Sequence, residues 1–269
     1  MIRNDYNGVV FYTFSNLSKE SKVKHLFSTR TGGVSEGKFA SMNLSYSRND
    51  VRESVTENFR RISKVGFPVE KMVFSDQVHG TDIRNVFAGD CGKNILSKSD
   101  IVGVDGLMTN VPGIVLVTFH ADCAPLYFYD KAKNAIALSH AGWRGTLMGI
   151  GNITVNEMKA KFGSCPSDIL VGIGPSICKN CFEAGAEVAD MFIEKFDYSA
   201  EFIANSQTDP NKRFIDLWGI NKQILMDSGV LEQNIETPDL CTKCNTDIFY
   251  SHRAMGWERG NMAAFLSIC

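Results

Sequence analysis

Short apolar runs rich in β-branched and aromatic residues constrain the fold of this chain more than any other feature. Each run is bounded by Gly, Pro, Asn or Asp, and together they cover residues 114–119, 126–129, 135–139, 169–173 and 248–251. Runs of this length and composition predict β-strands. Because some alternate between apolar and polar residues and others are continuously apolar, they favour a mixed sheet covered by helices over a strict βαβ repeat.

Four further segments have apolar residues at helical spacing. The clearest covers residues 51–62, follows an Asp50-x-x-Glu53 pattern typical of a capped N-terminus, and ends at Gly66. The other three helices are predicted, in chain order, over residues 147–162, 186–196 and 215–228. We therefore expect an α+β fold of mixed sheets with helices packed on their outer faces, in a single domain over residues 1–269.

The composition argues against several kinds of partner. The 269 residues include 28 basic and 30 acidic side chains, and 44% are hydrophobic. A protein that binds nucleic acid or an acidic membrane surface would need a basic excess. No run approaches the roughly 18 apolar residues of a membrane-spanning helix, and the first residues lack a signal-peptide pattern. We expect a cytoplasmic protein, monomeric or weakly dimeric, that acts on small molecules.

The eight cysteines are spread through a chain larger than the secreted scaffolds that depend on disulfides, which favours free thiols. Two pairs have the C-x-x-C spacing, Cys178 with Cys181 and Cys241 with Cys244. Together they would form a four-thiolate structural zinc site if the fold brought them together. The pairs are far apart in the sequence, so ordinary thiols or disulfides remain the alternative.

Three of the five histidines lie in the segments QVHG, HADC and SHAGW, beside small or polar residues. The predicted strands 114–119 and 135–139 end shortly before Cys123 and His140, and we expect these two ends to converge. With His79 they provide two imidazoles and a thiolate, which suit Zn²⁺ and leave a fourth position open for water or substrate. From spacing alone, isolated hydrogen-bonded histidines and a buried cysteine remain the alternative.

Motifs spread over most of the chain occur in a characteristic order. They are FSTRTGG at 27–33, SMNL at 41–44, DQVHG at 76–80, ADCAP at 121–125, HAGWRG at 140–145, GPSI at 174–177, CT at 241–242 and FYSHR at 249–253. This set resembles the YfiH family, also called the laccase-domain or multi-copper polyphenol oxidoreductase family. The resemblance implies a zinc site made by His79, Cys123 and His140. It also implies a fold similar to the catalytic domain of cytotoxic necrotizing factor.

The number of histidines tests the copper chemistry in that family name. A laccase needs imidazoles for a blue-copper site and for a further trinuclear cluster, whereas two imidazoles and a thiolate match only the first of these. Five histidines are too few for both. We therefore expect Zn²⁺, with Cu²⁺ as a substitute, and keep a copper-dependent polyphenol oxidase as an alternative.

The resemblance implies purine nucleoside metabolism. The implied reactions are phosphorolysis of adenosine, inosine, guanosine and methylthioadenosine, with adenosine deamination alongside. An open zinc site would activate water for attack on the purine C6. Deamination also needs a proton shuttle, for which Asp122 and Asp105 are the nearest candidates, although each is equally a strand-end or turn carboxylate.

Phosphorolysis requires an anion site beside the glycosidic bond. Arg30 is followed by Thr-Gly-Gly, which would combine a guanidinium with backbone N–H groups. Arg144 precedes a helix predicted to begin near residue 146, whose free N–H groups would favour phosphate. Asn43 and Gln77 are candidate contacts to a sugar hydroxyl or to the substrate, with Gln77 on a strand. The alternatives are a surface ion pair for Arg144 and a turn or cap for the others.

Aromatic and C-terminal residues near these motifs have two interpretations each. Trp143 is either a core aromatic or a platform on which a base stacks. Arg253 and Arg259 are either anion contacts or ordinary exposed arginines. The sequence departs from the family pattern at residues 183–185 and 257–260, where Glu-Val-Gly and Thr-Gly-Arg are usual. The resemblance therefore supports the C-terminal part of the site least.

A cysteine hydrolase is the main rival interpretation. Cys123, with His79 or His140 as base, would form an acyl-enzyme. The family's resemblance to a toxin deamidase, and a proposed role in editing peptidoglycan precursors, point to amide hydrolysis. Metal separates the two hypotheses, because a thiolate bound to zinc is not free to attack carbon. A third interpretation is an interaction module with a purely structural zinc ion.

Overall fold

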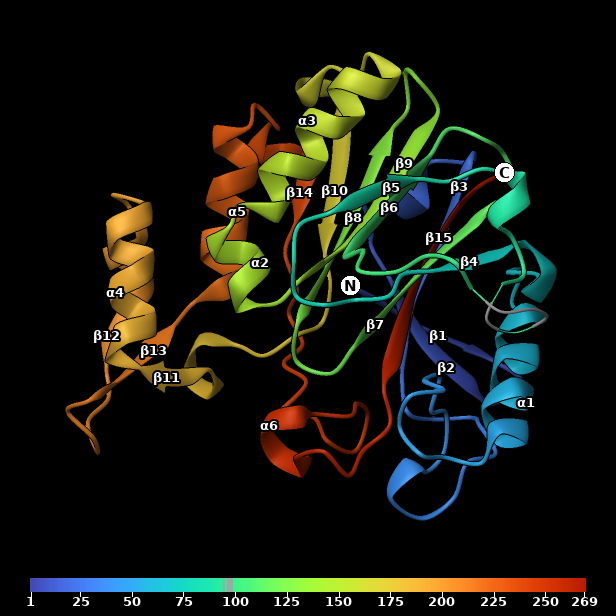
Figure 1. Ribbon diagram of the computed structural model, residues 1–269, viewed down its shortest axis with the longest axis horizontal. Helices are drawn as coiled ribbons and strands as arrows, with labels where there is room; N and C mark the ends of the chain where they lie inside the picture. The colour runs from blue at the N-terminus through green and yellow to red at the C-terminus, as the bar shows by residue number, and fades with distance from the viewer. Residues whose placement is uncertain (94, 96–98) are drawn as a thin grey trace.

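The computed structural model describes residues 1–93, 95 and 99–269. Two six-stranded mixed sheets face each other, and a three-stranded antiparallel sheet lies to one side (Figure 1). In the described residues the α-helices are α1 (Arg52–Ser63), α2 (Trp143–Leu147), α3 (Ile150–Phe162), α4 (Ala186–Lys195), α5 (Leu217–Asp227) and α6 (His252–Met255). The predicted α+β fold with mixed sheets is confirmed.

The first large sheet has the strand order β1-β2-β3-β15-β7-β4. Its neighbouring strands are antiparallel except for β4 and β7, which are parallel. The strands are β1 (Ile2–Tyr6), β2 (Val9–Thr13), β3 (Val23–Ser28), β4 (Met72–Phe74), β7 (Val115–His120) and β15 (Met262–Ile268). The last strand of the chain therefore lies inside this sheet, between an N-terminal strand and a central one.

The second large sheet has the order β14-β10-β8-β9-β6-β5, with parallel pairing only at its two edges. Its strands are β5 (Ile83–Asn85), β6 (Gly106–Thr109), β8 (Ala124–Asp130), β9 (Ala135–Ala141), β10 (Ile169–Ile173) and β14 (Ile235–Glu236). The small sheet consists of β11 (Glu183–Gly185), β13 (Lys212–Ile215) and β12 (Ile203–Asn205), in that order. Every residue of the central strands β8 and β9 is buried.

Apolar side chains join these elements into four layers. Between the large sheets, Phe27 and Leu116 of the first sheet belong to the same core as Tyr127 and Leu138 of the second. Helix α1 covers the outer face of the first sheet, and α3 with α5 covers the outer face of the second (Figure 1). Each sheet thereby buries both faces, which explains the nearly continuous apolar runs of its central strands.

The predicted helices match α1, α3, α4 and α5, with two local differences. Helix α3 begins at Ile150 because Gly149, in the left-handed conformation with a φ of 81°, separates it from α2. Asp50 does not cap α1, contrary to the prediction. The N-cap is Val51, and one carboxylate oxygen of Asp50 instead accepts hydrogen bonds from the side chains of Ser35 and Asn43.

The strand predictions match β7, β8, β9 and β10, but the strand expected over residues 248–251 is wrong. That segment forms turns and irregular backbone before α6. Its apolar character arises because Phe249 and Tyr250 are buried in the core between the sheets. None of the helices in the described residues has the length and apolar character needed to cross a bilayer.

Candidate functional site

His79, Cys123 and His140 come together at one end of the large sheets. Their donor atoms all lie within 4.8 Å of one another, and Cys123 Sγ lies 3.9 Å from His79 Nε2. Strands β8 and β9 pair with Pro125 opposite His140, which places the start of β8 beside the end of β9. The two strand ends therefore converge as expected, and the loop after β4 brings His79 to the same point.

Unusual backbone geometry makes this convergence possible. A Cβ atom at Gly142 would lie 2.9 Å from His79 Cδ2 and 3.2 Å from Cys123 Sγ, so only glycine leaves room for the donors. His79 and Asp122 have φ angles of 62° and 87°, in a region that non-glycine residues rarely adopt. Such conformations persist where neighbouring contacts hold them in place, and both residues have such contacts.

Asp105 holds the two imidazole-bearing segments in position. It is fully buried, and its Oδ1 accepts hydrogen bonds from His140 Nδ1 at 2.9 Å and from the backbone N–H of His79 at 3.0 Å. Its Oδ2 accepts from the backbone N–H groups of Val78 and Gly80. Burial alone would raise the pKa of Asp105, but the His140 hydrogen bond and charge, with the N–H donors, lower it.

An ionised Asp105 fixes the tautomer of His140. Because the carboxylate accepts the proton on Nδ1, the other ring nitrogen, Nε2, is the one available to a metal ion, which would displace the Nε2 proton on binding. Buried carboxylates commonly support metal-ligating histidines in this way. This geometry gives Asp105 an orienting role, and its part in proton transfer stays a prediction.

The thiol of Cys123 and the imidazole of His140 alter each other's pKa. Burial alone would raise the pKa of Cys123, but the charge and hydrogen bond of His140, aided by His79, lower it to about 6. Burial alone would lower the pKa of His140, but Cys123 and Asp105 raise it to about 9. Cys123 is therefore a thiolate at neutral pH, and the thiolate is the form that binds a metal or attacks carbon.

Asp122 connects the turn that carries Cys123 to the C-terminal segment. Its carboxylate accepts hydrogen bonds from Thr242 Oγ1 at 2.6 Å, Ser251 Oγ at 3.0 Å and the backbone N–H of Arg253 at 2.6 Å. All three donors belong to the C-terminal segment, and together they bind both oxygens of the carboxylate. The contacts account for a positioning role of Asp122, and its part in proton transfer stays a prediction.

The three donors open into a cavity of about 720 Å³, a size typical of small-molecule sites. Six aromatic side chains line it: Tyr46, Phe74, Phe119, Trp143, Phe182 and Trp257. Four arginines also line it: Arg48, Arg144, Arg253 and Arg259. The cavity thus combines flat apolar surfaces with positive charge beside the candidate metal donors.

Arg48 and Arg259 are an unusual pair in this lining. Neither forms an ion pair with a carboxylate in the part of the chain that the structure describes, and the Nε atom of each is buried there without a hydrogen-bond partner. Burial, reinforced by the charge of Arg48, lowers the pKa of Arg259 to about 10. Arg259 is only 5% exposed, so the default expectation of an exposed arginine is wrong for it.

Of the binding residues predicted from the sequence, Gln77 and Arg144 line the cavity, whereas Arg30 and Asn43 lie outside its lining. The Arg30 guanidinium donates to backbone carbonyl oxygens of two neighbouring segments. Asn43 is fully buried and donates to Asp50. Arg30 and Asn43 therefore hold loops together. This structural role explains why these motifs contain polar residues that do not contact the cavity.

Two local expectations for the cavity residues are wrong. Gln77 does not lie on a strand, because β4 ends at Phe74. Its side-chain amide pairs with both backbone polar groups of Phe119 at 2.7 Å. The helix after Arg144 is predicted to begin near residue 146, but α2 already begins at Trp143. Thr146 lies within α2 and its N–H donates to Gly142, so that N–H is not free for phosphate.

The sequence interpretation missed Arg48 and the full role of Asp105. Arg48 lies in a polar loop whose sequence carries no signal of a site. Its importance depends on a C-terminal partner, Arg259, that only the folded chain brings close. Trp143 lines the cavity, and the Arg144 guanidinium lies over its ring at 4.2 Å.

The donor set fits a divalent ion of intermediate softness such as Zn²⁺. Two imidazoles and a thiolate are common zinc ligands, Asp105 supplies the supporting carboxylate, and the cavity leaves space for a fourth ligand. Because Gly142 has no side chain, the space between the three donors stays free for an ion. The arrangement is therefore that of an open metal site beside an aromatic, cationic cavity.

Comparisons with known proteins find relatives over nearly the whole chain. Residues 24–269 match the family described as multi-copper polyphenol oxidoreductase laccase. The chain is 36% identical over 244 residues to "Purine nucleoside phosphorylase YlmD" of Bacillus subtilis (strain 168), covering 90% of this chain and 87% of that protein.

Two solved structures share the whole architecture. The hypothetical protein YfiH of Bacillus licheniformis gives a TM-score of 0.90 at 29% identity, with 98% of each chain covered. YlmD of Geobacillus stearothermophilus gives 0.87 at 32% identity, covering 98% of this chain and 97% of that one. The chain therefore belongs to the multi-copper polyphenol oxidoreductase laccase family, the YfiH family that its motifs resemble.

Proposed function

We propose that this protein is a zinc-dependent purine nucleoside phosphorylase. The observation that carries the proposal is the placement in one cavity of the open donor set with Arg48 and Arg259, whose buried Nε atoms have no hydrogen-bond partner in the described residues. Two neighbouring guanidiniums that have no carboxylate partner favour binding of an anion. Inorganic phosphate has oxygen atoms spaced to accept paired hydrogen bonds from a guanidinium. The name of the B. subtilis relative, purine nucleoside phosphorylase, supports the same activity.

In phosphorolysis, a phosphate oxygen forms a bond to C1′ of the ribose while the bond from C1′ to the purine nitrogen breaks, and the base leaves with that electron pair. Arg48 and Arg259 would hold the phosphate and offset its charge. Aromatic side chains such as Trp143 and Phe119 provide flat surfaces on which the purine can stack. Zn²⁺ held by His79, Cys123 and His140 would supply Lewis-acid polarisation of a substrate oxygen.

The proposed substrates are adenosine, inosine, guanosine and methylthioadenosine, with adenosine deamination as an accompanying activity. The same cavity would serve both reactions at different atoms of the nucleoside. In deamination water attacks C6 of the purine and ammonia leaves, whereas in phosphorolysis phosphate attacks C1′ of the ribose and the base leaves. Deamination therefore needs the metal donors but not the anion contacts of Arg48 and Arg259. This difference provides an internal control for the role of the arginines.

The proposal is tested by product analysis of purified protein of known metal content, incubated with adenosine with and without phosphate. We expect adenine and ribose 1-phosphate only with phosphate, and inosine under both conditions. The absence of conversion at stoichiometric zinc would overturn the proposal. Stoichiometric copper with oxidation of phenols, and no nucleoside conversion, would favour the polyphenol oxidase alternative.

Arg48→Gln sharpens this test. A hydrogen bond between charged groups contributes about 1.5–3 kcal/mol, and the substitution removes one such bond to phosphate. The KM for phosphate should therefore rise about 10-fold to 100-fold. The rate of inosine formation should change much less. Arg60→Gln, at a residue on α1 that does not line the cavity and has a 66% exposed side chain, is the matched control. Equal effects of the two substitutions on phosphate KM would argue against the anion site.

A second candidate is a cysteine hydrolase acting on an amide of a peptidoglycan precursor. Its supporting observation is the order Cys123, His140, Asp105, in which a thiolate faces an imidazole that a buried carboxylate orients. That order is typical of nucleophilic catalysis. Metal decides between the candidates, because amide hydrolysis by Cys123 should be fastest in the metal-free protein and phosphorolysis should be lost there.

A further inference from the structure

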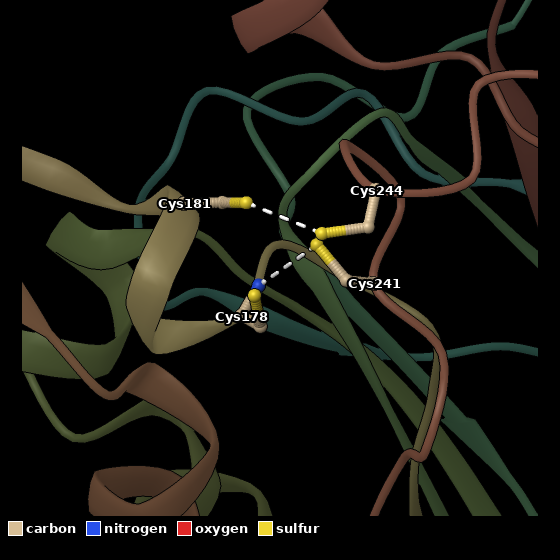
Figure 2. Close-up of side chains that lie close together, drawn as sticks. All are labelled: Cys178, Cys181, Cys241 and Cys244. Atoms are coloured by element: carbon tan, nitrogen blue, oxygen red, sulfur yellow. Dashed lines mark hydrogen bonds between the residues drawn. The ribbon is translucent and has the colours of Figure 1, made fainter.

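The two C-x-x-C pairs, far apart in sequence, meet in the structure. Figure 2 shows Cys178, Cys181, Cys241 and Cys244 pointing toward one another from two separate segments, and their Sγ atoms all lie within 4.8 Å of one another. The Cys181 and Cys244 sulfurs are 3.4 Å apart. Four sulfurs at about 2.3 Å from a tetrahedral Zn²⁺ would lie about 3.8 Å apart. The cluster therefore has nearly the dimensions of a four-thiolate zinc site.

Each pair is carried by a short turn, and the two turns are joined directly. The N–H of Cys181 donates to the carbonyl of Cys178 at 3.0 Å, and the N–H of Asn245 donates to the carbonyl of Cys241 at 3.2 Å. Ser176 pairs with Cys241 in an isolated parallel bridge. The backbone N–H of Cys178 also donates to Cys241 Sγ at 3.3 Å, a contact that favours the thiolate form. The backbone thus holds all four sulfurs together.

We propose that these four cysteines bind a structural Zn²⁺ ion, separate from the open site at His79, Cys123 and His140. The four protein sulfurs complete a tetrahedral shell and leave no position for substrate. On binding, the thiols release their protons to solvent, and no electrons are transferred because zinc does not change its oxidation state.

The charge around the cluster fits this ion. Four thiolates and Zn²⁺ carry a net charge of −2, and each C-x-x-C turn contains one lysine, Lys179 and Lys243. Arg253 adds a third cation, since its guanidinium donates to the carbonyl oxygens of Cys181 and Glu183. These cations would offset the charge of a metal-thiolate centre.

The cluster lies directly behind one wall of the substrate cavity. Ile177 and Phe182 flank the first pair in sequence, and both line the cavity. Thr242, inside the second pair, donates to the carboxylate of Asp122 beside Cys123. A metal ion at the cluster would therefore tie together two segments that shape the cavity. Its binding does not depend on which reaction the open site performs.

Zinc stoichiometry of the full-length protein tests the proposal. Purified wild-type protein should contain two zinc ions per chain, and the double variant Cys181→Ser/Cys244→Ser should contain one. The matched control Cys165→Ser/Cys269→Ser removes two exposed cysteines outside the cluster and should keep two. The same zinc content in the cluster variant and the wild type would overturn the proposal, as would iron in place of zinc.

A second measurement keeps the test decisive if the cluster variant does not fold. In Cys123→Ser/His140→Ala protein, the open site is disabled and the cluster is intact. X-ray absorption at the zinc edge should then show four sulfur ligands at about 2.3 Å and no nitrogen. No bound zinc, a nitrogen-containing shell, or a disulfide between cluster cysteines found by mass spectrometry would contradict a four-thiolate site.

Discussion

The two sulfur-containing clusters of this protein offer similar ligands in opposite arrangements. His79, Cys123 and His140 offer three donors and face a cavity, whereas Cys178, Cys181, Cys241 and Cys244 offer four donors and face one another. In zinc proteins, an open coordination position is typical of chemistry and a closed shell is typical of structural support. The comparison assigns reactivity to the first cluster and support of the cavity wall to the second.

The protein also holds the two clusters differently. The first is attached to the buried strands β8 and β9 and is fixed by the carboxylate of Asp105. The second joins two turns outside the large sheets, linked mainly by the bridge between Ser176 and Cys241. We therefore expect the first cluster to keep its shape without metal and the second to depend on its metal.

The largest expected effect comes from removing a donor of the open site. His79→Ala, Cys123→Ala and His140→Ala should each lose one zinc ion and reduce turnover by at least about 10³-fold, because the Lewis acid is lost. The melting temperature should fall by less than it does when the closed site is removed, because three protein donors bind zinc more weakly than four and a weaker ligand stabilises the fold less. Assays of turnover, metal content and thermal unfolding on the same samples check this. A metal-free Cys123→Ser protein with intact turnover would contradict the assignment.

Removing the closed site should lower thermal stability strongly and turnover little, the reverse of the effect at the open site. If zinc is bound at about 1,000 times its dissociation constant, its loss in Cys181→Ser/Cys244→Ser costs about 4 kcal/mol of folding free energy. For a chain of this size that lowers the melting temperature by roughly 8–16 °C. Below the transition, kcat should stay close to wild type while the KM for nucleoside rises. A variant that loses turnover without losing thermal stability would reverse the two roles.

Asp105→Asn tests how the open site is held. The amide keeps the shape of the carboxylate but removes the charge that fixes the His140 tautomer. Loss of such a supporting carboxylate predicts a zinc affinity about 10-fold to 100-fold weaker at the open site, with the closed site unchanged. Competition with a chromogenic chelator measures both affinities. Unchanged affinity at the open site would show that Asp105 supports only the backbone of residues 78–80.

The smallest effect concerns thiol reactivity in protein that has lost only the metal of its open site. With a pKa of about 6, Cys123 should lose about 10-fold in alkylation rate between pH 7 and pH 5, as its thiolate becomes protonated. Cys178 would still be a ligand of the closed-site metal, so its rate should stay low over this range. Site-resolved mass spectrometry after iodoacetamide treatment measures both rates. Faster labelling of Cys178 than Cys123 at pH 7 would contradict this contrast.

Local patterns were sufficient for much of the fold. The amphipathic spacing of α1, α4 and α5 and the apolar runs of β7 to β10 are properties of contiguous residues. The hairpin of β1 and β2 was missed because β1 is mostly exposed and has no apolar period. Its signal was the Asn7-Gly8 turn, where both residues have positive φ, as tight hairpin turns require.

The sites show where sequence reasoning ends. The meeting of Cys123 with His140 followed from two neighbouring strand ends, and the pairing of the C-x-x-C motifs was recognised as one of two outcomes. Arg48 and Arg259 come close together from loops that are distant in the sequence, and no sequence motif links the two loops. The role of Asp105 depends on its complete burial, which no local pattern indicates.

Stepwise removal of metal tests the contrast between the clusters most directly. Wild-type protein is treated with increasing chelator, and zinc content, nucleoside phosphorolysis and melting temperature are measured on each sample. We expect phosphorolysis to fall with loss of the first zinc equivalent, from the open site, with only a small drop in melting temperature. The larger drop in melting temperature should come with the second equivalent, because the more tightly bound ion stabilises the fold more. Phosphorolysis that survives loss of the first equivalent and falls together with the melting temperature would contradict the account.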